Sequence, residues 1–369
     1  MSAAIFIAVG EESGDLLGGE LAKAIKKLKP SLIIRAMGGS HLIEAGAELV
    51  VDISGGGTVG LLELFSVIPR YRAMLKQMKR ALKKEKPLAL IAIDNFGFNH
   101  LLCRFAYKLS IPVFYYSPPK VWAWGAFRGR MLAGYARMIY TLFPFEADFF
   151  RSLGVKAVCF GHPLAEKLTP RLKKENNLVA ILPGSRRMEV ENLLPDMLAG
   201  AKLLQDKYPS LRFVLGRART IDREYIDSFL AQSGVEIEIV DDVHSLLSRA
   251  YVTMLASGTA TLESALLATP MVIVYRAKPL SALLARIIAY KFVFGLPNYL
   301  AGRMIVPELL QNRLNPSTLA LQLEQLLSDR KKWLTMQEEL VKSVAPLRGM
   351  AGSSTERVAQ DILNNLQLN

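Results

Sequence analysis

The sequence has little cysteine and no basic N-terminal region. Only Cys103 and Cys159 occur among 369 residues, and both stand in apolar surroundings. This usage is typical of a reducing compartment and offers no metal-ligand spacing. The opening "MSAAIFIAVGEESGD" has an apolar run that stops at Gly10 without a preceding basic stretch. It therefore predicts a first β-strand rather than an export signal, and we expect a cytoplasmic protein.

Long apolar runs and the common nucleotide motifs are also missing. The most apolar long window, 280–297, is broken by Arg286 and Lys291, so it falls short of the roughly 20 residues that span a bilayer. The loop Gly10 to Asp15 has the wrong glycine spacing for a dinucleotide site, and its carboxylates would repel a pyrophosphate. Neither a Walker A sequence nor an Asp-x-Asp pair appears. We therefore expect no nicotinamide cofactor, no ATP chemistry and no metal.

Negative charge is in deficit, with 33 acidic against 46 basic residues and a net charge of +13. The segment 70–86 holds eight Lys or Arg against the single Glu85, and a patch of apolar residues precedes it: Leu61, Leu62, Leu64, Phe65 and Ile68. An apolar patch beside a basic helix favours an anionic membrane surface. The alternative is an amphipathic helix whose apolar stripe packs on a sheet. Nucleic acid is not expected, because aromatic residues do not interleave with the basic run.

Short apolar runs alternate with helical patterns along most of the chain. One series of predicted strands covers 4–10, 32–39, 88–94, 111–117 and 138–143, and a second covers 177–185, 212–216, 236–242, 251–258 and 271–276. This alternation predicts an α/β protein with two facing Rossmann-like domains and an interdomain cleft. We assign the domains to 1–165 and 166–345, joined by a charged linker over 164–176. A C-terminal helix over 346–369 is expected to pack back on the first domain.

Small residues follow one predicted strand of the second domain, at Ser257, Gly258 and Thr259. A helix N-terminus there would present unpaired amides and positive potential to an anion, although an ordinary capped helix is the alternative. Ala260 stands where a capping box would need Ser or Thr, so Glu263 is available for ribose hydroxyls. Ser185 and Arg186 follow another strand. Together these residues predict a metal-free diphosphate cradle.

Several motifs together resemble the lipid-A-disaccharide synthase family, inverting glycosyltransferases of the GT-B type. They are "GEESGD" (10–15), "VWAWG" (121–125), "LPGSRRMEVE" (182–191), "SGTATLE" (257–263) and "LPNYLAGRMIVPELLQ" (296–311). The resemblance covers nearly the whole chain. It implies transfer of 2,3-diacylglucosamine from its UDP donor to 2,3-diacylglucosamine 1-phosphate, which releases UDP. The cradle would then receive the UDP diphosphate.

This chemistry assigns expected roles to individual residues. Asp94 is our candidate for the base that deprotonates the acceptor hydroxyl. Arg303 would stabilise the departing UDP together with the helix N-terminus. Glu263 and Asn298 would hold sugar or ribose hydroxyls. Positioning of the acceptor or the donor sugar is assigned to Glu11, Ser13 and Asn99.

The chain departs from the family pattern after the third predicted strand. Where the family reads Asp-x-Pro-Asp-Phe-Asn, this chain keeps the first acid as Asp94 and has Gly97 in place of the second. The roles of Trp122 and Trp124 stay open, as does a homodimer. An N-acetylglucosamine transferase acting on a polyprenyl-linked precursor, a UDP-N-acetylglucosamine 2-epimerase and a two-lobed binding protein are the alternatives. The expected partners are both acylated sugars and the anionic surface of the inner membrane, on which the protein would sit peripherally.

Overall fold

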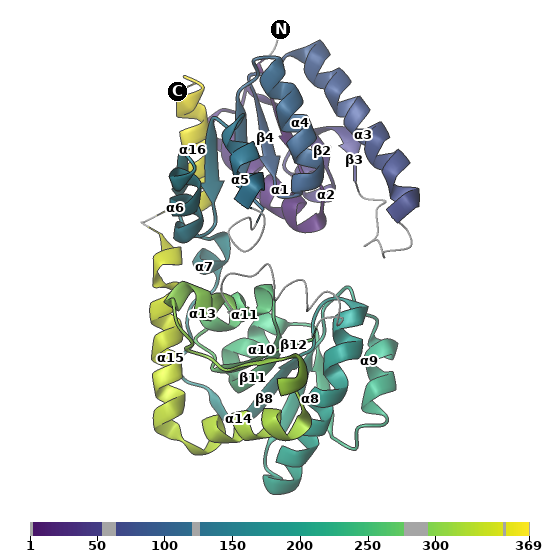
Figure 1. Cartoon of the computed structure of the whole chain (residues 1–369), viewed down its shortest axis with the longest axis vertical. Helices are drawn as coiled ribbons and strands as arrows, with labels where there is room; N and C mark the ends of the chain where they lie inside the picture. Colours follow the sequence, from purple (N-terminus) through teal and green to yellow (C-terminus); the bar gives the residue numbers. More distant parts are fainter. Residues whose placement is uncertain (1–2, 54–63, 120–125, 277–293, 350–351, 369) are drawn as a thin grey trace. The chain divides into compact units, whose positions relative to one another are not determined.

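The computed structural model describes residues 3–53, 64–119, 126–276, 294–349 and 352–368. The chain divides into two compact units, shown in Figure 1. Unit 1 comprises Met1–Pro163 and Gly349–Asn369, and unit 2 comprises Leu164–Arg348. The chain therefore leaves unit 1 once, builds unit 2, and returns to unit 1 with its last helix. The sequence-based boundaries at 165 and 346 lie within a few residues of these crossings.

Unit 1 is built on a parallel sheet with the strand order β3-β2-β1-β4-β5-β6-β7. The strands are mostly continuous apolar runs, as expected when helices cover both faces of a parallel sheet. Their bounds are β1 Ala4–Ala8, β2 Ile33–Gly38, β3 Glu48–Asp52, β4 Ala89–Ile93, β5 Val113–Tyr116, β6 Met138–Thr141 and β7 Ala157–Cys159. The helices are α1 Glu12–Leu28, α2 Ser40–Glu44, α3 Leu64–Glu85, α4 Phe96–Lys108, α5 Ala126–Ala133, α6 Pro144–Ser152 and α16 Ser354–Asn365.

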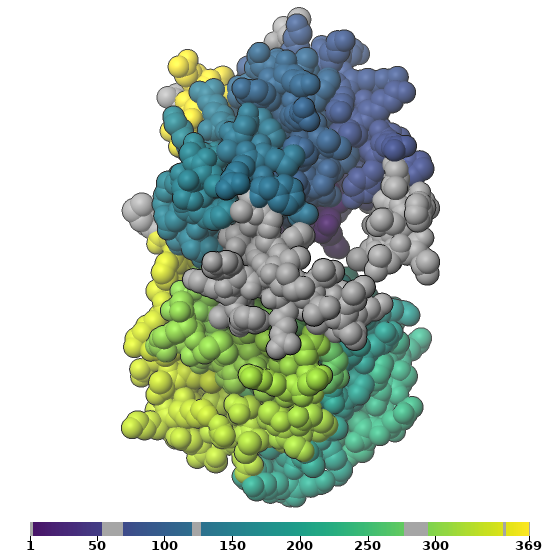
Figure 2. Space-filling view, in the orientation of Figure 1, coloured from purple at the N-terminus to yellow at the C-terminus, as the bar shows by residue number. Residues whose placement is uncertain are grey.

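The two faces of this sheet carry separate cores. On one face, Leu21 of α1 and Ile362 of α16 pack with Ile7 and Ile91 of the central strands. On the other face, the core takes residues from α3 and α4, with Met78 fully buried. Helix α16 contacts α1, and in Figure 2 the C-terminal atoms, coloured yellow, lie against unit 1. The last helix therefore completes the hydrophobic core of the N-terminal unit.

Unit 2 repeats the plan with the strand order β10-β9-β8-β11-β12-β13, again all parallel. The strands are β8 Glu175–Leu182, β9 Arg212–Gly216, β10 Ile237–Val240, β11 Ala250–Ala256, β12 Met271–Tyr275 and β13 Glu308–Leu310. The helices are α7 Pro163–Lys167, which begins at the crossing, α8 Arg187–Lys207, α9 Arg223–Leu230, α10 Val243–Arg249, α11 Thr259–Leu266, α13 Leu296–Ala301, α14 Pro316–Ser328 and α15 Arg330–Val344. In the described ranges, no helix has the length and apolar character needed to cross a membrane.

The segment 164–176, which the sequence predicts as a charged linker, forms hydrogen bonds with residues of unit 2. The Arg348 guanidinium donates to the carbonyls of Ala165, Leu168 and Leu266. The Gln337 amide donates to the carbonyl of Leu172 at 3.2 Å. The carbonyls of this segment and its last lysine therefore find partners that sequence patterns do not reveal.

That last lysine, Lys174, is buried and lies where two helices end. Its Nζ donates to the carbonyls of Leu247 at 3.1 Å and Ser248 at 3.0 Å, in the last turn of α10. It also donates to the Leu267 carbonyl at 2.9 Å, just past α11, and to Thr269 Oγ1 at 2.7 Å. Burial, with a smaller contribution from Arg171, lowers the pKa of Lys174 from 10.5 to about 7.

This burial predicts a pH-dependent stability of unit 2. Between about pH 7 and 10.5 the unfolded chain binds the Lys174 proton and the folded chain does not, so the unfolding free energy rises with pH across this window. Lys174→Met should remove that rise. It should also cost about 1–3 kcal/mol at pH 7, because buried acceptors lose their donor. Urea unfolding followed by circular dichroism measures both effects.

The neighbouring Lys173 is exposed and supplies the matched control. Lys173→Met should leave both the stability at pH 7 and its pH dependence close to those of the parent chain. An unchanged pH slope in Lys174→Met would show that Lys174 keeps its ordinary pKa in the folded protein.

Candidate active site

The predicted site residues gather where the strand order of each sheet reverses. In unit 1 this point lies between β1 and β4, and in unit 2 it lies between β8 and β11. Open parallel sheets bind ligands at such a point, beyond the carboxyl ends of the strands. Glu11 follows β1, Asp94 follows β4, Ser185 follows β8 and Ser257 follows β11. Each unit therefore presents its own set of candidate residues.

In unit 1 the loop after β1 lies directly against the turn after β4. A Cβ atom at Gly10 would lie 1.9 Å from Asn95 Nδ2, so this approach requires glycine. Glu11 and Ser13 are exposed at the start of α1, and Glu11 makes no side-chain cap bond. Asp15, which sequence reasoning did not single out, is buried and accepts from the Gly39 and His41 amides at 2.7 and 2.9 Å. It holds the loop after β2 in place.

The turn after β4 has an unusual backbone. Asp94 and Asn95 are consecutive non-glycine residues with positive φ, 49° and 37°, a conformation that clusters at functional sites because it is strained. The residue that caps α4 is Asn95, whose Oδ1 accepts from the Phe98 amide at 3.4 Å. Asp94 is half-buried and is not the cap of the helix. Its carboxylate is therefore not used to cap α4.

Asn99 and Gly97 complete this turn in different ways. Asn99 is fully buried, and its Nδ2 donates to the carbonyls of Ala8, Ile93 and Asp94 at 3.3, 3.0 and 3.0 Å. The side chain ties β1 to β4, and the expectation that Asn99 positions a substrate stays a prediction. Gly97 is exposed, with no heavy atom within 4 Å of a Cβ built there. An acid at position 97 would therefore fit.

In unit 2 the helix α11 begins as the cradle hypothesis requires. Gly258 precedes it in an extended conformation, and no side chain caps the helix. Gly258 and Thr259 are exposed, whereas Thr261 is buried and its hydroxyl donates to the Gly258 carbonyl at 2.7 Å. Ser257 Oγ donates to the Phe294 carbonyl at 3.1 Å. The first turn of α11 therefore presents its amide groups and positive end to the edge of the sheet.

The turn after β8 already holds a carboxylate. Glu189 Oε2 accepts from the amides of Ser185 at 2.9 Å and Arg186 at 3.3 Å, and Glu189 Oε1 lies 3.0 Å from Arg186 NH1. Gly184 makes this possible, because a Cβ at its φ of 119° would lie 2.4 Å from Glu189 Oε2. The predicted binding of a diphosphate by this turn stays a prediction. In this structure the anionic group at the turn is a side chain of α8 itself.

Glu263 has a neighbour that sequence reasoning missed. His244 Nε2, from the first turn of α10, lies 3.4 Å from Glu263 Oε1, and the Glu263 side chain is 19% exposed. Both residues lie near the carboxyl edge of the sheet, because α10 follows β10 and α11 follows β11. A signal was present in the sequence, since His244 stands two residues after the acidic end of a predicted strand. Protonated His244 would orient the Glu263 carboxylate.

Asn298 and Arg303, both expected to contact the ligand, have side-chain partners within the protein. Asn298 is fully buried: its Oδ1 accepts from the amides of Ile305 and Val306, and its Nδ2 donates to Glu308 Oε1 at 2.8 Å. Its polar atoms bind the surrounding loop, and the expectation that it holds a ligand hydroxyl stays a prediction. The Arg303 side chain is 61% exposed and forms an ion pair with Glu339 of α15. It is accessible, but it already has an anionic partner.

Some predicted residues lie outside the described part of the chain. Trp122, Trp124, Leu61 and Leu62 are among them, and the side chains of Leu64, Phe65 and Ile68 at the start of α3 are not described. Across the described ranges, no group of three or more His, Cys, Asp or Glu side chains is arranged to hold a metal ion.

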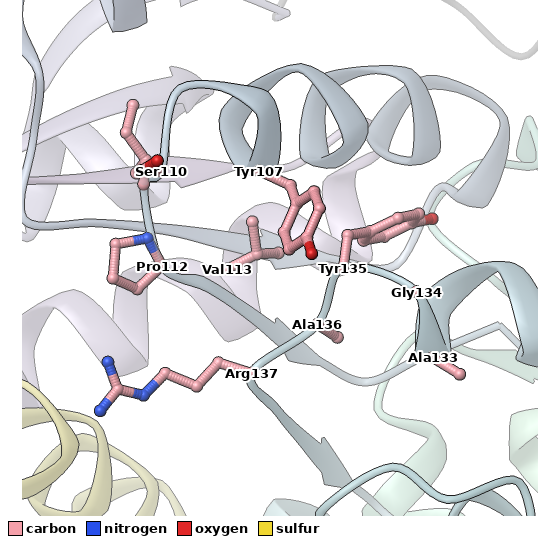
Figure 3. A pocket seen from close by; sticks show the side chains of 10 residues that line it. Tyr107, Ser110, Pro112, Val113, Ala133, Gly134, Tyr135, Ala136 and Arg137 are labelled. Carbon is pink, nitrogen blue, oxygen red and sulfur yellow. The ribbon is translucent and has the colours of Figure 1, made fainter.

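A hollow of about 650 Å³ lies at the opposite edge of the unit 1 sheet, before β5 and β6. Figure 3 shows Tyr107 and Tyr135 beside it, with Arg137 directed away from both rings. Tyr135 is buried, and its hydroxyl lies 2.7 Å from His100 Nδ1. This hollow is at the amino ends of the strands and so is separate from the candidate site.

Comparison with known proteins identifies relatives along the whole chain. The profile of one family, described as lipid-A-disaccharide synthetase, matches residues 5–362. A lipid-A-disaccharide synthase from Geobacter metallireducens is 35% identical over 379 residues, which cover 98% of this chain and 97% of that protein. One from Coxiella burnetii is 33% identical over 374 residues, which cover 98% of each chain.

Among solved structures, the S. aureus MnaA-UDP co-structure aligns with a TM-score of 0.67 and 14% identity, over 100% of this chain and 98% of that one. Acinetobacter baumannii MurG aligns with a TM-score of 0.62 and 17% identity, over 99% of this chain and 100% of that one. At this level of identity the likeness concerns the fold alone. It confirms the predicted α/β fold with two Rossmann-like domains.

Proposed function

Because the chain belongs to the lipid-A-disaccharide synthetase family, we propose how its residues carry out the transfer that defines this family. The protein is a glycosyltransferase of lipid A biosynthesis. It transfers 2,3-diacylglucosamine from its UDP donor to 2,3-diacylglucosamine 1-phosphate and releases UDP. The polyprenyl-linked transferase and the epimerase are not favoured, because the family profile and the relatives at 33–35% identity are lipid-A-disaccharide synthases.

The observation that carries the donor site is the uncapped N-terminus of α11 at the strand reversal of unit 2. Its amides and the Thr259 hydroxyl would bind the UDP diphosphate and stabilise the charge that develops as UDP departs. Glu263 would accept from the ribose hydroxyls, with His244 beside it. Arg186 and Arg303 would add positive charge after exchanging their glutamate partners for phosphate oxygens. This arrangement requires no metal or other cofactor.

The acceptor side belongs to unit 1. Asp94 would remove the proton from the acceptor hydroxyl as that oxygen attacks the anomeric carbon, which inverts the configuration. Glu11 and Ser13 are exposed on the loop that packs against this turn, so they would position the acceptor. No second carboxylate is available at Gly97, which leaves Asp94 as the acid of this turn that can act as base.

The basic face of α3 supports a peripheral contact with the inner membrane from the cytoplasmic side. Five cationic side chains line a hollow of about 480 Å³ together with Leu75 and Phe105, namely Arg72, Lys76, Lys79, Arg80 and Lys83. The Lys79 ammonium lies 5.3 Å from the centre of the Phe105 ring. Cations around an apolar floor suit anionic lipid headgroups with acyl chains beneath them. A homodimer stays a prediction.

The proposed reaction is tested by product analysis. The purified chain is incubated with diacylated or non-acylated UDP-glucosamine donors and diacylglucosamine 1-phosphate, and the products are identified by mass spectrometry. The tetraacyl disaccharide 1-phosphate and UDP should form from the diacylated donor, with and without excess EDTA. Turnover of only the non-acylated donor would contradict the assignment, and strict dependence on added Mg²⁺ would contradict the metal-free cradle.

Asp94→Asn tests the base. The amide keeps the shape of the side chain but accepts no proton, so kcat should fall roughly 10²–10⁴-fold while UDP binding and the melting temperature stay nearly unchanged. Asp148→Asn is the matched control, because Asp148 is an exposed carboxylate on α6 that pairs with Arg151. Ordinary turnover by folded Asp94→Asn would move the base to another residue.

Replacement of Lys76, Lys79 and Lys83 by Gln tests the membrane contact. Each cation near an anionic surface contributes about 1 kcal/mol, so binding to vesicles containing phosphatidylglycerol should weaken roughly 100-fold. Activity on a short-chain substrate in solution should persist. As a control, Lys108, Lys173 and Lys331 are exposed and dispersed, and their replacement removes the same charge. Equal weakening in both triple variants would attribute binding to net charge rather than to α3.

A further inference from the structure

The carbonyl oxygen of Asp94 accepts two hydrogen bonds from buried side chains. The Tyr115 hydroxyl donates to it at 2.5 Å, and Asn99 Nδ2 donates at 3.0 Å. Tyr115 and Asn99 are both fully buried. A carbonyl that receives two donors of this kind has a fixed direction, and the Asp94–Asn95 peptide plane is fixed with it. The carboxylate of Asp94 branches from the residue that these two bonds hold.

The contacts oppose the strain of the turn. Asp94 and Asn95 both have positive φ, which non-glycine residues adopt only when the surrounding structure requires it. If both donors were removed, the Asp94 carbonyl would lose these two hydrogen bonds. The turn could then relax toward ordinary φ. The Asp94 side chain would then leave its position at the carboxyl edge of β4.

We propose that Tyr115, acting together with Asn99, is a positioning residue for the catalytic base Asp94. The inference rests on the proposed function, in which Asp94 takes the acceptor proton. Tyr115 does not touch substrate in this account. It acts by holding the Asp94 carbonyl, so that the carboxylate meets the acceptor hydroxyl with the geometry that proton transfer needs.

The chemistry of Tyr115 suits this task. It lies on β5, which pairs with β4 so that Tyr115 stands beside Ala92, two residues before Asp94. Burial raises the pKa of Tyr115 well above its ordinary value. The hydroxyl therefore stays protonated at neutral pH and continues to donate.

Asn99 contributes the second bond and also joins two strands. Its Nδ2 reaches carbonyls at the ends of both β1 and β4, and its Oδ1 is buried without a hydrogen-bond partner among the described residues. Burial of an unsatisfied acceptor is costly. This cost is consistent with an asparagine whose Nδ2 is needed as a donor at this place. Because Asn99 supports the fold as well as the turn, Tyr115→Phe is the cleaner variant.

The experiment is a double-mutant cycle of Tyr115→Phe and Asp94→Asn, with kcat, the KM of the UDP donor and the melting temperature measured for each variant. Tyr115→Phe keeps the ring and removes one donor, so kcat should fall about 10- to 100-fold while the donor KM stays unchanged. In the Asp94→Asn background, Tyr115→Phe should cause no further loss, because there is no base left to position. A purely structural role would lower the melting temperature and leave kcat per folded molecule unchanged.

Tyr140→Phe is the matched control. Tyr140 is a fully buried tyrosine on the next strand, β6, and its hydroxyl donates to Asp361 at 2.7 Å rather than to the Asp94 turn. It should keep kcat. If Tyr115→Phe fails to fold, Asn99→Ala removes the other donor and is read in the same way.

Two outcomes separate the inference from the proposed function. Wild-type kcat in folded Tyr115→Phe, or losses that add in the double variant, would overturn the positioning role while Asp94 remains the base. Full activity of Asp94→Asn would overturn the base assignment and, with it, the positioning role.

Discussion

The reversal of strand order in each parallel sheet is the constraint on which the chemistry of this chain depends. All strands of a parallel sheet end at one edge, and at the reversal the two adjacent chains leave that edge toward opposite faces. Before they separate, the two chains begin side by side. In unit 1 the loop after β1 therefore starts against the turn after β4, so closely that Gly10 has no room for a side chain. In unit 2 the same rule places the turn after β8 beside the start of α11. The positions of the proposed base and of the proposed diphosphate cradle are therefore set first by the topology of each sheet, and only then by individual side chains.

The sequence predicts the parts of this arrangement that are local. Buried parallel strands are continuous apolar runs, so most strands are recognisable, and the small residues at 257–259 reveal the start of α11. Of the edge strands, β10 is predicted, whereas β3, β7 and β13 are missed, because the apolar runs within these three strands are no longer than three residues. The family motifs likewise place Asp94 and Ser257 at strand ends without any knowledge of packing.

What the sequence does not reveal is which polar atoms the fold itself uses. The sequence makes Asn298 a plausible ligand residue. In the structure, however, its side-chain amide bonds to Glu308 and to the backbone amides that follow Met304. Asn99 is bound to carbonyls of β1, which lie about 90 residues earlier in the chain. Lys174 belongs to a charged segment and yet is buried against carbonyls of α10. In each case the deciding partner is distant in sequence, and no local pattern contains that information.

The proposed donor site is also shaped by competition between carboxylates and phosphate. Glu189 occupies the amides of Ser185 and Arg186, and Glu339 pairs with Arg303. A phosphate oxygen that binds these groups must displace a glutamate. Both carboxylates are largely buried, with side chains 24% and 23% exposed, so the phosphate must offset the loss of partly desolvated ion pairs. A single negative charge gains little from such an exchange, whereas a diphosphate offers several charged oxygens to the same donors and to the N-terminus of α11. The internal glutamates thus keep the cationic groups ordered and at the same time favour a ligand with the charge of a nucleoside diphosphate.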